Sequence, residues 1–243
     1  MKKVLTFCLF LFCLSITTYC FLKYFNTKQD NIRIVEDQEK IIDIAELPEE
    51  PNEESKINFE ELQSINPDII AWLYIEGTNI NYPILQNKSN TYYLKHNYKK
   101  EYSGAGSIYM DASASKDFNS QNTFIYGHYT RNKTMFGEIG NFMNQDFFDT
   151  HKEIFIYTPA KTYIVDLFSV YVDEANSNSY QMSYASAEEL ESYIKMIQSK
   201  SKIKSNIEDI SIEDRIITFY SCSRETNFKK QDRYFLHGII REY

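Results

Sequence analysis

The chain of 243 residues is organised around the segment Ile216–Ser223, IITFYSCS, near its C-terminus. Its β-branched and aromatic residues predict a buried strand over residues 215–220. The strand leads into a cysteine flanked by two serines. A thiol at the end of a rigid strand is held in place while the following loop leaves it accessible, so Cys222 is a candidate nucleophile. The alternative interpretation is a buried structural cysteine.

Cys222 is the only cysteine outside the apolar N-terminal segment, which contains Cys8, Cys13 and Cys20. It therefore has no intrachain disulfide partner in the folded region. In an extracellular domain, a single unpaired cysteine is either a route to intermolecular pairing or a reactive thiol. This context favours the functional interpretation of Cys222.

The N-terminal segment is almost wholly apolar over residues 4–25 and is preceded by Lys2 and Lys3. It is long enough to cross a bilayer as one helix, and the positive-inside rule keeps its N-terminal end in the cytoplasm. A cleaved signal peptide is the alternative, but no good small-residue cleavage site follows the apolar run. We expect an uncleaved, single-pass signal-anchor over residues 1–25, with the rest of the chain outside the cell membrane.

The next segment, residues 26–56, is rich in Asp, Glu, Gln and Asn and predicts an acidic stalk. Within it, residues 32–47 can form an amphipathic helix, and residues 49–55 are expected to be extended and solvated. Three of the 26 basic residues lie in the anchor, so 23 remain against 34 acidic residues, a net charge of −11. The external part therefore has no basic footprint for nucleic acid, and its field does not attract it to anionic lipid or wall polymers.

The remaining residues, 57–243, are expected to form one folded domain dominated by strands. Strand patterns cover residues 71–75, 80–85, 106–110, 123–126, 154–158, 163–172, 215–220 and 233–241. A short helix begins after the N-cap Asn58, the region 134–148 is partly helical, and 187–199 is an amphipathic helix. Many strands with few helices predict a mainly β fold, a closed or nearly closed β-barrel with an N-terminal helix and a helix inserted before the Cys222 strand.

A catalytic thiol needs a base or a cationic neighbour, and the chain offers four histidines. His96 and His151 lie in polar segments that we expect to be exposed. His237 lies within the last strand, and strand alternation alone does not exclude it. His128 follows a strand and a glycine, so it can meet Cys222 at one rim of the barrel. A lone histidine is more often a surface or hydrogen-bonded filler residue, so this pairing is a hypothesis.

Acyl transfer also needs a group that holds the oxyanion. Arg233 begins the final strand after a polar loop, residues 223–232, and this strand is expected to be the hairpin partner of the Cys222 strand. An arginine at such a place is usually a surface salt-bridge residue, but the hairpin would put it near Cys222. The sequence contains no Gly-rich phosphate loop and no His/Cys spacing suitable for zinc, so neither a cofactor nor a metal is expected.

With IYGHY around His128, TFYSCS around Cys222 and DRYFLHG around Arg233, in this order, the chain resembles the sortases. These are membrane-anchored cysteine transpeptidases of Gram-positive bacteria. The helix inserted before the cysteine strand is similar to class B specifically, and so are four segments: INPDIIAWLYIEGTNINYPILQ, YYLKHNY, GSIYMD and NKTMFGEI. The resemblance runs in order over residues 59–243.

The resemblance implies a sortase-type barrel and a transpeptidase that acts on secreted proteins with a C-terminal sorting motif. Cys222 would attack the carbonyl of a Thr in that motif and form a thioacyl intermediate, which an amine of a peptidoglycan precursor then resolves. His128 would be the general acid and then the general base. Arg233 would donate to the oxyanion and hold the substrate. This chemistry needs no metal or cofactor.

The resemblance also implies a substrate groove. By position against the class B pattern, Asn90, Leu94, Tyr180 and Ser221 match groove residues. Ser221 stands where the family more usually has Thr, which keeps the hydroxyl and drops a methyl group. Phe219 stands where the family more usually has Leu.

Three other functions remain open at this point. A class B-like pilin polymerase would use the same catalytic residues with a pilin lysine as nucleophile, and laddered polymers on the cell would reveal it. A secreted cysteine protease would release free acid even in the presence of the natural amine. A non-catalytic wall-binding β domain would leave Cys222 unreactive towards thiol reagents.

Overall fold

The computed structural model describes residues 2–48, 57–222 and 231–243. The chain divides into two compact units, Met1–Lys40 and Ile41–Tyr243, which we treat separately. The predicted extended part of the stalk, residues 49–55, lies outside the described residues. Most of the predicted loop between the last two strands also lies outside them.

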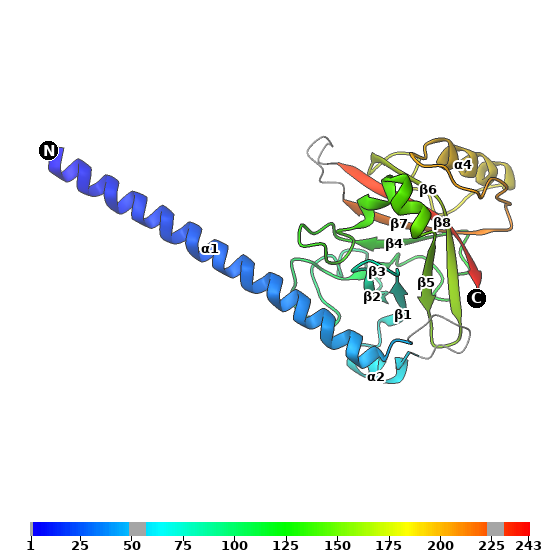
Figure 1. Cartoon of the computed structure of the whole chain (residues 1–243), viewed down its shortest axis with the longest axis horizontal. Helices are drawn as coiled ribbons and strands as arrows, with labels where there is room; N and C mark the ends of the chain where they lie inside the picture. The colour runs from blue at the N-terminus through cyan, green and yellow to red at the C-terminus, as the bar shows by residue number, and fades with distance from the viewer. Residues whose placement is uncertain (1, 49–56, 223–230) are drawn as a thin grey trace. The chain divides into compact units, whose positions relative to one another are not determined.

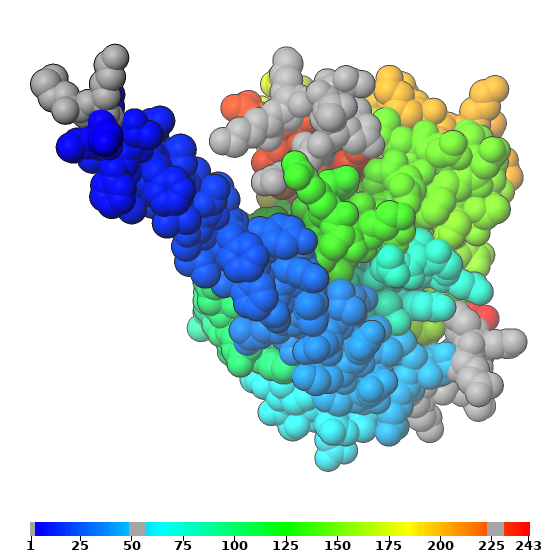
Figure 2. Space-filling model, turned by 60° about the vertical axis from the view of Figure 1, so that its left-hand side comes forward, coloured from blue at the N-terminus to red at the C-terminus, as the bar shows by residue number. Residues whose placement is uncertain are grey.

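The N-terminal unit is a single helix, the blue part of Figure 1. Helix α1 runs from Lys2 to Ala45 without interruption, since no Gly or Pro occurs between these residues. Its segment from Lys3 onward is long and apolar enough to cross a membrane by length and composition. The large apolar side chains of residues 4–25 are exposed (Figure 2). The helix is therefore compatible with a single-pass membrane anchor.

The expected division between anchor and stalk does not appear as a break in secondary structure, because α1 continues through both. Its last residues belong to the second unit, where Ile41 and Ala45 are buried. They share an apolar cluster with Ile57, Phe59 and Leu62. The compact second unit thus includes side chains that the sequence pattern assigns to the stalk.

The second unit is a closed barrel of eight strands, as the strand patterns predict (Figure 1). Around the barrel the strand order is β1-β2-β3-β4-β7-β8-β6-β5. The strands are β1 (Ile69–Tyr74), β2 (Asn81–Leu85), β3 (Ile108–Met110), β4 (Asn122–Gly127), β5 (Glu153–Tyr157), β6 (Thr162–Glu174), β7 (Arg215–Cys222) and β8 (Asp232–Glu242). Two neighbouring pairs, β2–β3 and β4–β7, are parallel, and the others are antiparallel.

The helices of this unit follow local sequence signals. Helix α2 (Phe59–Ile65) begins at Asn58, whose side chain accepts a hydrogen bond from the Glu61 amide at 3.2 Å. Helix α4 (Ala187–Ser199) has the predicted bounds and buries its apolar face, Leu190, Tyr193, Ile194 and Ile197. The partly helical region contains a 3₁₀ helix, η1 (Ile139–Met143), and a short helix, α3 (Gln145–Thr150).

The strand that organises the sequence, β7, lies between β4 and β8. It pairs in parallel with β4, where Gly127 faces Ser221, and antiparallel with β8, where Cys222 faces Arg233. The predicted hairpin partnership between the last two strands is confirmed. Parallel neighbours such as β4 and β7 have their C-terminal ends at the same rim of the barrel, and the antiparallel neighbour β8 begins there. These two strand ends and the start of β8 therefore meet at one rim.

Candidate functional site

A pocket of about 270 Å³ lies at this rim. It is lined by residues of four strands, β3, β4, β7 and β8, and of the segments that follow β2, β4 and β6. The lining residues are Asn90, Leu94, Tyr109, Tyr126, Gly127, His128, Tyr180, Tyr220, Ser221, Cys222 and Arg233. All seven site residues that we named from the sequence are among them.

Strand register explains why Cys222, His128 and Arg233 meet in this pocket. Cys222 and Arg233 are direct cross-strand partners, with Cα atoms about 4.5–5.5 Å apart. The last pair in the parallel β4–β7 ladder is Gly127 and Ser221. His128 and Cys222 are the next residues of the two chains, so they occupy equivalent positions just beyond this pair. Neighbouring strands lie about 4.8 Å apart, so the thiol and the imidazole extend from adjacent positions of the rim.

His128 is oriented by the main chain of the segment after β2. Its Nε2 lies 2.8 Å from the carbonyl oxygen of Leu94. A carbonyl only accepts, so Nε2 carries the proton in this contact. That carbonyl packs against Gly106, where a Cβ atom would lie 2.8 Å from the Leu94 oxygen and the backbone φ is +60°. A side chain at position 106 would therefore strain the segment that orients the imidazole.

Arg233 lies beside a tyrosine of the neighbouring strand. Its guanidinium donates to the Asp232 carbonyl at 2.9 Å. Burial raises the pKa of Tyr220 to about 12, and the charge of Arg233 and its hydrogen bond to Tyr220 oppose this rise. A guanidinium held at the pocket wall is a permanently charged, planar donor for an oxyanion or a peptide carbonyl.

A tyrosine wall, formed by Tyr109, Tyr126, Tyr180 and Tyr220, closes one side of the pocket. Ring centroids of Tyr126 and Tyr220 are 5.6 Å apart, edge to face, and those of Tyr180 and Tyr220 are 5.5 Å apart. Sequence reasoning missed three of these four side chains. A signal was available, because Tyr126 and Tyr220 each lie two residues before a named site residue and so share its strand face.

The four predicted groove residues line the pocket in different ways. Asn90 places its amide against Asp111, and Tyr180 places its hydroxyl 2.5 Å from the hydroxyl of Tyr126. Ser221 precedes Cys222 on β7, so alternation directs its side chain to the opposite face. Its hydroxyl is buried and has no hydrogen-bond partner in the described part of the chain.

His237, the second candidate base, is buried in the interior, fully covered from solvent. Its Nδ1 lies 2.9 Å from the hydroxyl of Thr218, which itself donates to Asn122, and its Nε2 lies 3.1 Å from the hydroxyl of Tyr171. Burial, with a smaller contribution from the charge of Lys200, lowers the pKa of His237 to about 3. The ring is a neutral member of a core network and does not line the pocket.

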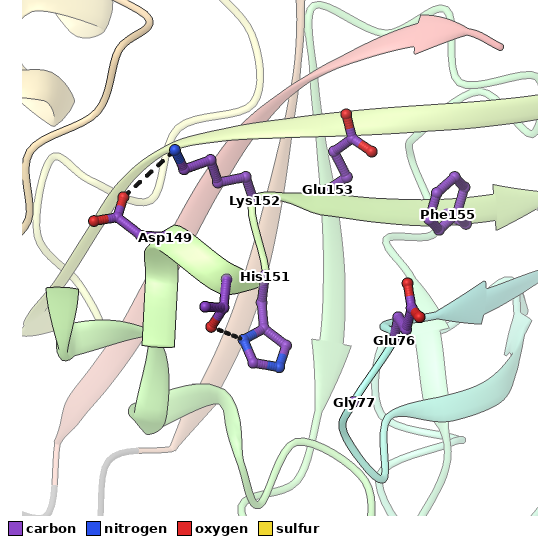
Figure 3. Close-up of a pocket in the computed structure, with 8 residues that line it drawn as sticks. Glu76, Gly77, Asp149, His151, Lys152, Glu153 and Phe155 are labelled. Atoms are coloured by element: carbon purple, nitrogen blue, oxygen red, sulfur yellow. Dashed lines mark hydrogen bonds and ion pairs between the residues drawn. The ribbon is translucent and has the colours of Figure 1, made fainter. Parts of the chain in front are cut away.

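The other two histidines also lie away from the pocket. His96 stacks on Tyr92 with ring centroids 4.2 Å apart and bonds the Tyr92 carbonyl through Nδ1 at 2.7 Å. His151 lines a second pocket, of about 580 Å³, between the β1–β2 turn and the start of β5 (Figure 3). Charged groups there pair locally, with Lys152 3.6 Å from Asp149, and no cysteine is present.

Possible metal ligands and disulfides were sought among the described residues. Over residues 2–48, 57–222 and 231–243, no group of three or more His, Cys, Asp and Glu is placed to hold a metal ion. Cys222 is half-exposed and the other three cysteines are exposed on α1, and none of the four forms a disulfide within the described residues. The pocket therefore offers a thiol, an imidazole and a guanidinium as its reactive and charged groups.

Comparison with known proteins agrees with this geometry. The family model described as "Sortase domain" matches residues 73–239. The Sortase B of Listeria monocytogenes is 35% identical over 74% of this chain and 72% of its own length. Sortase B from B. anthracis in complex with AAEK1 has a TM-score of 0.77 and 30% identity, over 88% of this chain and 99% of that chain.

A Staphylococcus aureus sortase B–substrate complex has a TM-score of 0.71 and 29% identity, over 76% of this chain and 85% of that chain. The family match contains β4, β7 and the part of β8 that begins at the rim, so it covers the three strand ends that bring His128, Cys222 and Arg233 together. The chain therefore belongs to the sortase family and is a class B cysteine transpeptidase.

Proposed function

We propose that this sortase cleaves a C-terminal sorting motif of secreted proteins after a Thr, through a thioacyl enzyme on Cys222, and joins the Thr to a cell-wall amine. The observation that supports it is the meeting of Cys222, His128 and Arg233 at one pocket from three adjacent strand ends. A nucleophile, an acid–base group and a charged donor are what acyl transfer requires.

In the first half-reaction, the Cys222 thiolate attacks the Thr carbonyl, so that a C–S bond forms while the peptide C–N bond breaks. The leaving amine takes a proton from the His128 imidazolium. In the second, the incoming amine attacks the thioester, gives a proton to His128 and releases Cys222 as thiolate. Since Nε2–H of His128 is held by the Leu94 carbonyl, the proton that moves is the one on Nδ1.

Arg233 faces Cys222 across the β7–β8 ladder, so its guanidinium can reach an oxygen bonded to the attacked carbon. We assign it to the oxyanion and to the substrate main chain. Asn90, Leu94 and Tyr180 are proposed to contact the peptide with their side chains. Ser221 is proposed to contribute through its main chain, because its side chain points to the other face of the strand.

We also propose a topology for the full chain. Residues 1–25 would anchor it in the membrane with the N-terminus cytoplasmic, because Lys2 and Lys3 precede the span. Residues 26–56 would be the stalk and 57–243 the extracellular catalytic domain. The partners would then be secreted proteins with a sorting signal and a peptidoglycan-precursor amine. Protease added to wall-stripped cells should digest the catalytic domain, and full protection would contradict this orientation.

The experiment for the reaction uses the full-length enzyme in detergent, a library of Thr-containing peptides and an amine such as triglycine. We expect products in which the peptide, cut after Thr, is joined to the amine. Free acid alone, at saturating amine, would indicate a protease. Transfer only to a protein lysine would indicate a pilin polymerase. No product together with an unreactive Cys222 would indicate a non-catalytic wall-binding domain.

A further inference from the structure

A buried carboxylate lies behind the tyrosine wall and takes no direct part in the proposed chemistry. Asp111 follows β3 and is 1% exposed. One carboxylate oxygen accepts from the amide and the hydroxyl of Ser113, at 2.8 and 2.6 Å. The other accepts from the side-chain amide of Asn90 at 2.7 Å and from the hydroxyl of Tyr126 at 2.6 Å. Two of its partners, Asn90 and Tyr126, line the pocket.

The carboxylate is ionised at neutral pH. Burial alone would raise the pKa of Asp111, but the hydrogen bonds from Ser113, Tyr126 and Asn90 outweigh burial and lower it. An ionised carboxylate only accepts hydrogen bonds. Asp111 therefore fixes the direction of every hydrogen bond that it makes, including those to the two pocket residues.

The hydrogen bond from Tyr126 to Asp111 also determines which hydroxyl donates between Tyr126 and Tyr180. The single hydroxyl proton of Tyr126 goes to Asp111, so the 2.5 Å contact between the two tyrosine hydroxyls is made with the proton of Tyr180. Because Tyr180 donates in this contact, the lone pairs of its oxygen stay available to accept a hydrogen bond in the pocket. A neutral partner in place of Asp111 would leave the direction of this chain undetermined.

The orientation of Asn90 is fixed in the same way. Its amide nitrogen donates to Asp111, and its carbonyl oxygen accepts from the main-chain amide of Ala112 at 2.7 Å. The two contacts define which end of the carboxamide is the donor, since Asp111 cannot donate. Together with the Ala112 amide, this carboxylate thus sets the hydrogen-bonding pattern of two pocket residues from different segments.

We propose that Asp111 is a positioning residue that presets the pocket wall, with Tyr180 as an acceptor and Asn90 in one orientation, to receive an N–H donor of the bound peptide. It acts through Asn90 and Tyr126 and does not touch the substrate. The proposal rests on the proposed function, since it concerns the same peptide groove. Such preorganisation favours substrate binding over the chemical step.

The chain supplies a matched control outside the pocket. Asp68 also accepts from a buried tyrosine, Tyr93, at 2.7 Å and from an asparagine, Asn87, at 3.0 Å. Its pKa is also lowered, because the hydrogen bonds from Tyr93 and Asn87 and the charge of Lys100 outweigh burial. Asp68 is half-buried and also pairs with Lys100 at 3.4 Å, but Asp68→Asn removes a carboxylate with a similar Tyr–Asn partner set without altering a pocket hydrogen bond.

The test is Asp111→Asn in the full-length enzyme, assayed with the library peptide that the wild type cleaves fastest. An amide has one acceptor oxygen, so it cannot serve all four donors. We expect KM to rise about tenfold, the loss of about one good hydrogen bond, with kcat within about twofold of the wild type. Asp68→Asn should leave both constants near wild type. Equal KM values for Asp111→Asn and the wild type would overturn the proposal.

Tyr180→Phe tests the route. If the effect passes through the Tyr180 hydroxyl, Asp111→Asn should add little to the KM of Tyr180→Phe, and the double variant should fall well short of the product of the two single effects. Fully multiplicative effects would show that Asp111 does not act through Tyr180.

A substrate-free readout separates this inference from the proposed function. In protein with ¹³C-labelled tyrosine rings, the Cζ signal missing from Tyr180→Phe identifies Tyr180. We expect this signal to shift in Asp111→Asn and not in Asp68→Asn. An unshifted signal would overturn the inference even if the enzyme transfers peptides. A shifted signal in an enzyme that cleaves no peptide would support the hydrogen-bond chain while the proposed reaction fails.

Discussion

Two histidines, one just after β4 and one within β8, lie next to β7 in opposite environments. His128 follows β4 at the rim, is half-exposed and lines the pocket with Cys222. His237 lies within β8, fully buried, with hydrogen-bond partners on both ring nitrogens. Both are near the cysteine strand in the sheet, and His237 even pairs with Thr218 of β7. Proximity to β7 in the sheet therefore does not by itself place a histidine in the pocket; the position of the residue along its strand does.

The difference has a physical basis. A ring that exchanges protons must carry charge for part of the reaction, and burial without a counter-charge opposes the imidazolium. Burial holds the pKa of His237 near 3, so it stays neutral at physiological pH. We infer that His128 at the rim serves in catalysis and that His237 in the core stabilises the fold. Four substitutions test this difference.

The largest effect is expected for Cys222→Ala. Loss of the nucleophile should reduce turnover to background while the midpoint of thermal unfolding stays close to the wild-type value, because Cys222 is half-exposed at a strand end. Peptide cleavage and circular dichroism melting measure the two quantities. A variant that keeps half of the wild-type activity would place the nucleophile elsewhere.

The next effect is that of His128→Ala, which should lower kcat/KM by about 10² to 10⁴ through loss of general acid–base catalysis. Its thermal midpoint should change little. His237→Gln, assayed in parallel on the same peptide at a temperature where both variants are folded, should keep kcat/KM within about tenfold of the wild type. The reverse ranking would indicate that His237 is the acid–base group and would contradict its assignment to His128.

Arg233→Lys should follow in size. Lysine keeps the charge but loses the planar fork, so kcat/KM should fall by about 10² to 10³, as for one lost oxyanion donor. The pH dependence of kcat/KM should keep its shape, since the substitution exchanges one cationic side chain for another. A limb displaced by more than one pH unit with little loss at the optimum would mean that Arg233 tunes a pKa instead of holding the transition state.

The smallest effect concerns stability and pH at His237. Its folded-state pKa of about 3 is below the ordinary value of 6.5, so the unfolded chain binds a proton that the folded chain does not. The contribution of the neutral His237 ring to the free energy of unfolding is fully present above about pH 6.5 and is lost as the pH falls towards 3. Between pH 7 and 4.5 the free energy of unfolding therefore falls by about 2–3 kcal/mol because of this ring. Urea unfolding of His237→Gln should show a smaller loss over this interval than the wild type, and equal losses would contradict the buried neutral ring.

The sequence predicts the parts of this site that depend on local patterns. The β-branched run before Cys222, the Gly-His pair after β4 and the arginine that opens β8 are each visible within a few residues. Strand pairing then brings them together at one rim, and the closed barrel and the bounds of α4 are confirmed. These features follow from alternation and propensity, which are properties of short segments.

The hydrogen-bonded layer behind the pocket could not be predicted in this way. Asp111 accepts from Tyr126, 15 residues away, and Tyr126 meets Tyr180, a further 54 residues away. No periodicity connects positions so far apart, because register and loop paths decide the contact. Ser221 is the opposite case, since simple alternation with Cys222 already indicates that its side chain points away from the pocket.

The most direct test of the account is to locate the acyl group on the enzyme. Full-length enzyme in detergent is mixed with the best library peptide without amine, quenched within one turnover, digested and mapped by mass spectrometry. An adduct ending in Thr is expected on the fragment that contains Cys222, in the wild type and in His237→Gln. The adduct should form far more slowly in His128→Ala and not at all in Cys222→Ala. An adduct on any other residue, or peptide cleavage by Cys222→Ala, would contradict it.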